Sequence, residues 1–329
     1  MKILYLTNHQ PLTDQFNDYM SDLLLHGLRE KFGTDVIDFP GSWYLYKDES
    51  KKRELKKENL WGKGFTISNI LDNYDSIDRD DLQSKIKSKY FDLIIYSSIR
   101  RSKPFLDEVV KYDNKYLFID GEDDQSIDND VSKLGFYFKR ELIKKNSKLL
   151  PINFAIPKKK IIKQINSNPK YLLAPLIPGR LKTYIYENEQ DYYRMYENSV
   201  FALTYKKAGW DTLRHYEILM NGCLPLFLNL DNCPNNTMTS FPKELALDIK
   251  LRFDKILSYY FPLKIYKFKF LDIQKFLKYI LSKKMSLENF LNNEQDIFEL
   301  KSEILDYTRD NLTTKNLADY VIDTFNKLK

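Results

Sequence analysis

Residues 206–228 read KKAGWDTLRHYEILMNGCLPLFL, and this stretch decides the fold. An apolar, strand-like run precedes it at 200–205, and a second such run closes it at 224–228. A loop and a helix therefore lie between two expected strands, and the helix ends at Asn221 and Gly222. This order of elements is typical of one half of a nucleotide-binding α/β domain.

The start of the expected helix offers a site for an anion. Backbone N–H groups are unpaired at a helix N-terminus, and Lys206 and Lys207 lie beside them in the sequence, so a diphosphate can bind there. Glu217, further along the helix, is able to accept hydrogen bonds from two neighbouring sugar hydroxyls. The alternative is a surface ion pair between Arg214 and Glu217, worth roughly a few tenths of a kcal/mol.

Residues 214–226, RHYEILMNGCLPL, resemble the donor-binding signature of GT-B glycosyltransferases. In that family a Glu on this helix holds the nucleotide ribose, and a glycine and a proline close the motif. With KKAGWD ahead of it, the stretch is similar to a set of bacterial and viral proteins described as glycosyltransferase-like or exostosin-like. The resemblance implies an α/β fold with two Rossmann-like domains that face each other across a cleft, followed by a C-terminal helical segment.

The resemblance places a nucleotide-sugar donor in the second domain. Asp211 or Thr212 would cap the helix. PGRLK at 178–182 would set two cations against the diphosphate, where they offset charge that grows as the glycosidic bond breaks. A solvated basic turn is the alternative for this loop. The expected donor-binding residues are Arg180, Lys182, Lys206, Lys207, Trp210, Asp211, Arg214, His215 and Glu217.

Candidate catalytic groups lie in the first domain. DGEDD at 120–124 follows an expected parallel strand, at the sheet edge where α/β proteins bind ligands. The same Asp-Gly-Glu-Asp, followed by GFYFKRE at 135–141, recurs in the glycosyltransferase-like proteins. These carboxylates would hold a general base or a divalent cation, or they form a plain acidic turn. His9 is a second candidate base, because some inverting GT-B enzymes keep a histidine in this loop; otherwise it is polar surface. The expected catalytic residues are His9, Asp120, Glu122 and Asp123, and no metal site is assigned.

Strands and helices alternate along the chain. In the first domain strands are expected at 2–7, 35–40, 91–96, 115–120 and 148–154, with a helix at 18–32 that Gly33 ends. A polar, proline-bounded stretch at 157–169 predicts the linker. We therefore expect an acceptor-side domain at 1–165 and a nucleotide-sugar-binding domain at 166–329. Amphipathic helices are expected from about residue 272, and in GT-B proteins the last one commonly crosses back to the first domain.

Composition narrows the class of protein. The 329 residues, 43% hydrophobic and 30% charged, suffice for two folded domains. The net charge of +6 suits an anionic nucleotide sugar and is only weak evidence for a nucleic-acid partner.

Two cysteines give no disulfide framework, and no apolar run or leader predicts a membrane span or a secreted chain. We expect a cytoplasmic protein, with contact at a membrane surface left open. The chain carries no dinucleotide or P-loop glycine motif.

The resemblance implies transfer of a sugar, a hexose by expectation, from a UDP- or GDP-sugar to a glycan such as a surface polysaccharide. No further cofactor is required in principle, because cations and a helix N-terminus can stabilise the leaving diphosphate. Whether the reaction inverts or retains is open. Two alternatives stay open as well: a DNA-base glucosyltransferase and a non-catalytic nucleotide-binding protein of the same fold.

Overall fold

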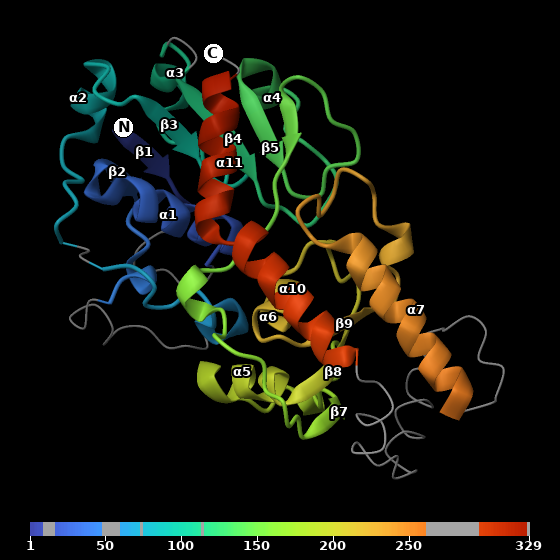
Figure 1. Ribbon diagram of the computed structural model, residues 1–329. Coiled ribbons are helices and arrows are strands. Elements are labelled where there is room, and N and C mark those ends of the chain that lie inside the picture. The colour runs from blue at the N-terminus through green and yellow to red at the C-terminus, as the bar shows by residue number, and fades with distance from the viewer. Residues whose placement is uncertain (9–16, 48–59, 73–74, 113–114, 261–295, 328–329) are drawn as a thin grey trace.

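The computed structural model describes residues 1–8, 17–47, 60–72, 75–112, 115–260 and 296–327 (Figure 1). The expected helices between about 272 and 295 lie outside these ranges. Within them the chain forms two parallel sheets with helices packed around them. The six-stranded sheet is built by the first half of the chain (1–165), and the three-stranded sheet by the second half (166–329).

The six-stranded sheet has the strand order β2-β1-β3-β4-β5-β6, with every neighbouring pair parallel. Its strands are β1 (Ile3–Leu6), β2 (Val36–Phe39), β3 (Leu93–Tyr96), β4 (Tyr116–Asp120), β5 (Phe136–Lys139) and β6 (Leu149–Pro151). The central strands β1, β3 and β4 are buried throughout and apolar except for Asp120 at the end of β4, as expected for a sheet covered on both faces. The sequence analysis predicted all of these strands except β5.

The helices of the first half connect these strands. They are α1 (Tyr19–Phe32), α2 (Leu82–Lys87), α3 (Leu106–Val109) and α4 (Val131–Leu134). At the start of α1, the side chain of Asp18 accepts hydrogen bonds from the N–H groups of Met20 and Ser21. Gly33 follows α1 with φ 58°, a conformation that favours glycine, so the predicted end of this helix is confirmed.

The second half repeats the parallel pattern on a smaller scale. Its sheet has the order β7-β8-β9, formed by β7 (Tyr171–Leu173), β8 (Ser199–Thr204) and β9 (Leu224–Phe227). Helix α5 (Glu189–Glu197), which the sequence analysis missed, precedes β8, and α6 (Leu213–Met220) joins β8 to β9. Helix α7 (Lys243–Tyr260) follows and packs against β9.

The last helix returns to the first half of the chain (Figure 1). Helix α10 (Ile297–Asn311) packs against α6 and β9, and α11 (Thr314–Lys327) packs against α1. A Cβ on Gly27 would lie 1.9 Å from the carbonyl oxygen of Thr314, so the glycine is needed for this close approach. His26 Nδ1 lies 2.8 Å from the Thr314 hydroxyl. The expected crossing of the last helix is thus observed.

Candidate functional site

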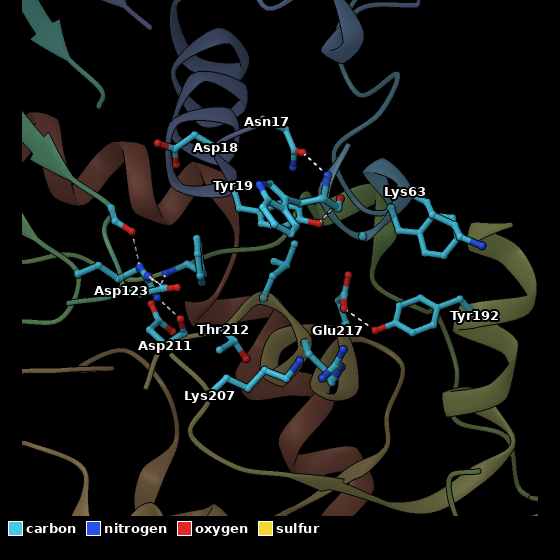
Figure 2. A pocket seen from close by; sticks show the side chains of 18 of the residues that line it. Asn17, Asp18, Tyr19, Lys63, Asp123, Tyr192, Lys207, Asp211, Thr212 and Glu217 are labelled. Atoms are coloured by element: carbon cyan, nitrogen blue, oxygen red, sulfur yellow. Dashed lines mark hydrogen bonds and ion pairs between the residues drawn. The ribbon is translucent and has the colours of Figure 1, made fainter. Parts of the chain in front are cut away.

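A cavity of about 500 Å³ opens where the two halves of the chain meet (Figure 2). The first half contributes residues 17–19, the turn around Trp61 and the loop 121–123, while the second half contributes Tyr184 and the start of α6. Because side chains from both halves line it, the cavity depends on how the halves are joined.

The loop that leads into α6 is fixed by an acidic side chain from the first half. Glu141, just after β5, is 1% exposed and accepts hydrogen bonds from the N–H groups of Trp210 and Asp211, each at 2.9 Å. A Cβ on Gly209 would lie 2.7 Å from the Glu141 carboxylate oxygen. The glycine of KKAGWD is therefore required by the approach of Glu141.

Arg140 joins the halves at the same place. Its buried guanidinium donates to the carbonyl oxygens of Gly121 and Asp211 and to the carboxylate of Asp123. Burial opposes the charge on Arg140, but the surrounding carboxylates outweigh burial and raise its pKa. Arg140 therefore stays charged and holds the cavity wall of the first half against the loop before α6.

Asp211 acts in this junction as a buried hydrogen-bond acceptor. Its carboxylate accepts from the N–H of Phe154 at 2.9 Å and from the hydroxyl of Tyr216 at 2.7 Å. Burial raises the pKa of Asp211 to about 6. The expectation that a side chain caps α6 is wrong: Thr212 is the N-cap residue but makes no capping hydrogen bond, and Asp211 is engaged elsewhere.

Two cations from the second half face the cavity without a carboxylate partner. Lys207 Nζ lies 5.8 Å, and Arg214 Cζ 5.3 Å, from the centre of the Tyr184 ring. Among the described residues, neither cation forms a salt bridge, and the buried Nε of Arg214 has no hydrogen-bond partner. Burial raises the pKa of Tyr184, but Arg214 and Lys207 outweigh burial and lower it. An anion in the cavity could therefore contact both cations without breaking a salt bridge to a described residue.

Glu217 lines the cavity, but both of its oxygens already accept protein hydroxyls. Oε1 accepts from Thr66 at 2.6 Å and Oε2 from Tyr192 at 2.7 Å; Figure 2 shows the latter bond. The side chain is buried, and burial raises its pKa against the effect of these two hydrogen bonds. Glu217 is therefore not part of a surface ion pair with Arg214.

Thr66 belongs to a segment of the first half, residues 60–66, that bridges to the second half beside the cavity. The Thr66 N–H donates to Glu189 Oε1 at 2.6 Å, in addition to the bond from its hydroxyl to Glu217. Nearby, Lys63 Nζ lies 2.6 Å from the carboxylate of Glu187. These contacts fix segment 60–66 over α6 and α5.

The first-half wall of the cavity combines an exposed aromatic ring with a buried amide. Trp61 is 59% exposed, and its backbone is held in place because its N–H donates to Asn17 Oδ1 at 2.7 Å and its carbonyl accepts from Tyr19 at 2.6 Å. The Nδ2 of Asn17 is buried and has no partner among the described residues. The wall thus presents a flat apolar face and an unused hydrogen-bond donor.

The acidic loop after β4 divides between the core and the cavity. Asp120 does not line the cavity: it is buried, pairs with Lys139 Nζ at 2.9 Å and accepts from the Tyr137 hydroxyl at 2.6 Å. Glu122 and Asp123 do line it, and each is paired with an arginine. In the described ranges, no group of three or more His, Cys, Asp or Glu side chains is arranged to hold a metal ion.

Other sequence candidates lie away from the cavity. His215 is buried, its Nδ1 lies 2.8 Å from the Thr204 hydroxyl, and burial lowers its pKa to about 3, so it is a neutral core residue. Trp210 is also buried, with Lys206 Nζ 5.5 Å from its ring centre. The side chains of His215 and Trp210 therefore belong to the packed core around the loop before α6 and do not line the cavity.

Arg180 and Lys182 occupy an exposed turn after β7 and do not line the cavity. His9 lies outside the described residues. The sequence candidates that the cavity brings together are Glu122, Asp123, Lys207, Asp211, Arg214 and Glu217.

Sequence reasoning missed the residues that complete the site: Asn17, Trp61, Thr66, Arg140, Glu141, Tyr184 and Tyr192. A signal existed for Arg140 and Glu141, since they end the GFYFKRE motif directly after an apolar, strand-like run. The others stand in loops or in a helix whose sequences show no pattern that links them to α6.

Similarity to known proteins is found in the structure of this chain but not in its sequence. No protein-family model and no curated protein sequence matches it. The chain is similar in structure to a crystal structure of a glycosyltransferase from Rickettsia africae ESF-5, with a TM-score of 0.51 and 10% sequence identity. The match covers 99% of this chain and 98% of that chain, so the likeness in fold extends over both halves. No described helix combines the length and apolar character needed to cross a membrane.

Proposed function

We propose that this protein is a glycosyltransferase that moves a sugar from a nucleotide-sugar donor to a glycan acceptor. One observation carries the proposal: Lys207 and Arg214 face a cavity of about 500 Å³, and neither forms a salt bridge with a described residue. Lys207 is exposed at the cavity and Arg214 is half-buried with an unpartnered Nε, so both can donate charge-assisted hydrogen bonds to a diphosphate. The likeness in fold to the Rickettsia africae glycosyltransferase supports the same class.

The proposed architecture is that of GT-B enzymes, with domains at 1–165 and 166–329. Two parallel sheets of six and three strands, with a cavity lined from both halves, support this division. The α11 helix, which packs against α1 in the first half, supports it as well. The second domain would bind the donor and the first the acceptor.

At the donor end, Lys207 and Arg214 would contact the diphosphate of a UDP- or GDP-sugar. They would stabilise the negative charge that grows on the leaving nucleoside diphosphate as the glycosidic bond breaks. Glu217 keeps a second acceptor position on each oxygen beyond those used by Thr66 and Tyr192, so it can still meet a ribose hydroxyl. Because Thr66 belongs to segment 60–66, the position of the Glu217 carboxylate depends on that segment.

At the acceptor end, the proposal uses Trp61, whose exposed ring offers a flat face for the C–H surface of a sugar. The buried, unpartnered Nδ2 of Asn17 would donate to a sugar hydroxyl only after a side-chain movement exposes it. Asp123, although paired with Arg140, is the most exposed carboxylate of the acidic cluster in the cavity, and we keep it together with His9 as a candidate base.

Calorimetric titration tests this function. UDP, GDP, CMP, ADP and TDP would be titrated into wild type, Arg214→Gln and, as a control, Arg194→Gln, which alters an exposed arginine on α5 that pairs with Asp191. We expect one nucleotide to bind, with an affinity about 10- to 100-fold lower in Arg214→Gln and unchanged in the control. Failure of every nucleotide to bind the folded wild-type protein would refute the proposed donor site.

A further inference from the structure

The turn after β7 exposes two large apolar side chains. Leu181 is 85% exposed and Ile185 is 68% exposed, the highest values among the large apolar residues that the structure describes. Residues 180–185, here called the tip, form a firm turn in which the Thr183 hydroxyl donates to the carbonyl of Arg180 at 2.8 Å and accepts from the N–H of Ile177 at 3.0 Å. Such side chains gain free energy when a partner removes them from water.

The tip also carries uncompensated positive charge. Arg180 and Lys182 are exposed on either side of Leu181, and neither forms a salt bridge with a described residue. The carboxylates that follow in the sequence are already neutralised by cations: Glu187 by Lys63, Glu189 by Lys160 and Asp191 by Arg194. The tip therefore combines two exposed apolar side chains with two exposed cations that have no salt bridge to a described residue.

We propose that the tip docks on the surface of an anionic lipid bilayer. Leu181 and Ile185 would enter the headgroup region, while Arg180 and Lys182 would contact lipid phosphates. Charge complementarity favours an anionic bilayer, because a planar anionic surface can meet Arg180 and Lys182 while it covers Leu181 and Ile185, and residues 180–185 include no carboxylate that would repel it. The firm turn presents these groups with little loss of conformational entropy on binding.

Docking would also orient the cavity. Tyr184 in the tip and Tyr186 next to it line the cavity, so the cavity mouth would lie close to the bilayer. A membrane-borne acceptor, a glycan carried on a lipid, then becomes the acceptor class. This last step rests on the proposed function, whereas bilayer binding by the tip does not.

Co-sedimentation with vesicles tests the docking. Wild type should sediment with mixed phosphatidylglycerol and phosphatidylcholine vesicles and much less with phosphatidylcholine alone. We expect Leu181→Ser/Ile185→Ser to bind the anionic vesicles about 10-fold more weakly or worse, and Arg180→Gln/Lys182→Gln about 30-fold more weakly. All of these substitutions are exposed, so the fold should persist, and nucleotide titration of each variant should match wild type.

Matched controls come from elsewhere on the surface. Leu251→Ser removes an apolar side chain that is 59% exposed on α7, and Lys144→Gln/Lys145→Gln removes two exposed lysines. These variants should bind the anionic vesicles within about 2-fold of wild type, as expected for residues away from the contact. The proposal is overturned if wild type does not sediment with anionic vesicles or if the controls lose as much binding as the tip variants. It is also overturned if wild type is a dimer that Leu181→Ser/Ile185→Ser converts to a monomer, because the tip would then be a protein interface.

Discussion

Replacing Glu141 with Gln would remove one charge from the junction between the two halves while keeping its shape. The Glu141 carboxylate accepts the N–H groups of Trp210 and Asp211, each at 2.9 Å, in a buried position. A Gln oxygen can accept only one of them, and its NH₂ group would face the other. The orphaned N–H costs about 1–3 kcal/mol, and the surviving bond loses charge assistance worth about 1 kcal/mol. We expect the free energy of unfolding to fall by about 3 kcal/mol.

Urea unfolding followed by circular dichroism measures this loss. With a slope of about 3 kcal/mol per M, the midpoint for Glu141→Gln should fall by about 1 M. Glu187→Gln is the matched control, because it neutralises a carboxylate that is 79% exposed and pairs with Lys63 at the surface, where such pairs contribute about 0–1 kcal/mol. If Glu141→Gln lowers the midpoint no more than Glu187→Gln does, the carboxylate does not hold the loop and the reasoning fails.

Three further changes test the rest of the framework. Thr66→Val removes the hydroxyl that donates to Glu217 and keeps the shape of the side chain. Calorimetric melting should show that the free energy of unfolding falls by about 1–3 kcal/mol. An unchanged melting curve would contradict a stabilising contact between Thr66 and Glu217. Asp211→Asn tests pH dependence: burial raises the folded pKa of Asp211 from 3.8 to about 6, so the folded state holds this proton more tightly. Wild type should then lose about 2 kcal/mol of stability relative to Asp211→Asn as pH rises from about 4 to about 6. Urea titrations at several pH values measure this, and stability curves of the two proteins that run parallel across this range would contradict it. Gly27→Ala would place a methyl group 1.9 Å from the Thr314 carbonyl oxygen. The backbone amides of α11 should therefore exchange faster with deuterium, although alanine favours a helix over glycine by about 1 kcal/mol. An unchanged exchange rate would contradict the close packing of α11 on α1.

The repeating elements of the fold were predictable because local patterns specify them. The apolar runs around Ile3–Leu6 and Leu93–Tyr96 are long enough to indicate buried parallel strands, and Asp18 and Gly33 bound α1 by capping chemistry. Strand β5 was missed because its apolar run is only three residues long, 136–138, and continues into three charged residues that include the last strand residue, Lys139. That lysine is buried only because Asp120 pairs with it from the neighbouring strand, a contact that no local pattern reveals.

The site was predictable in part, for a similar reason. The segment around Arg214 and Glu217 is continuous in the sequence, so its helix and its charges could be recognised together. The partners that determine how those charges act come from distant segments: Thr66 for Glu217, and Glu141 for the loop before α6. The sequence predicts Asp211 as a donor ligand or a helix cap, but the bond that its carboxylate accepts from the N–H of Phe154, in the first half, could not be predicted from local sequence.

The most direct test of the central claim is a crystal structure of the protein with the nucleoside diphosphate that titration selects. We predict that the nucleotide lies in the cavity with its diphosphate oxygens within hydrogen-bond distance of Lys207 and Arg214. A nucleotide bound outside the cavity, or inside it with its phosphates away from both cations, would contradict the account.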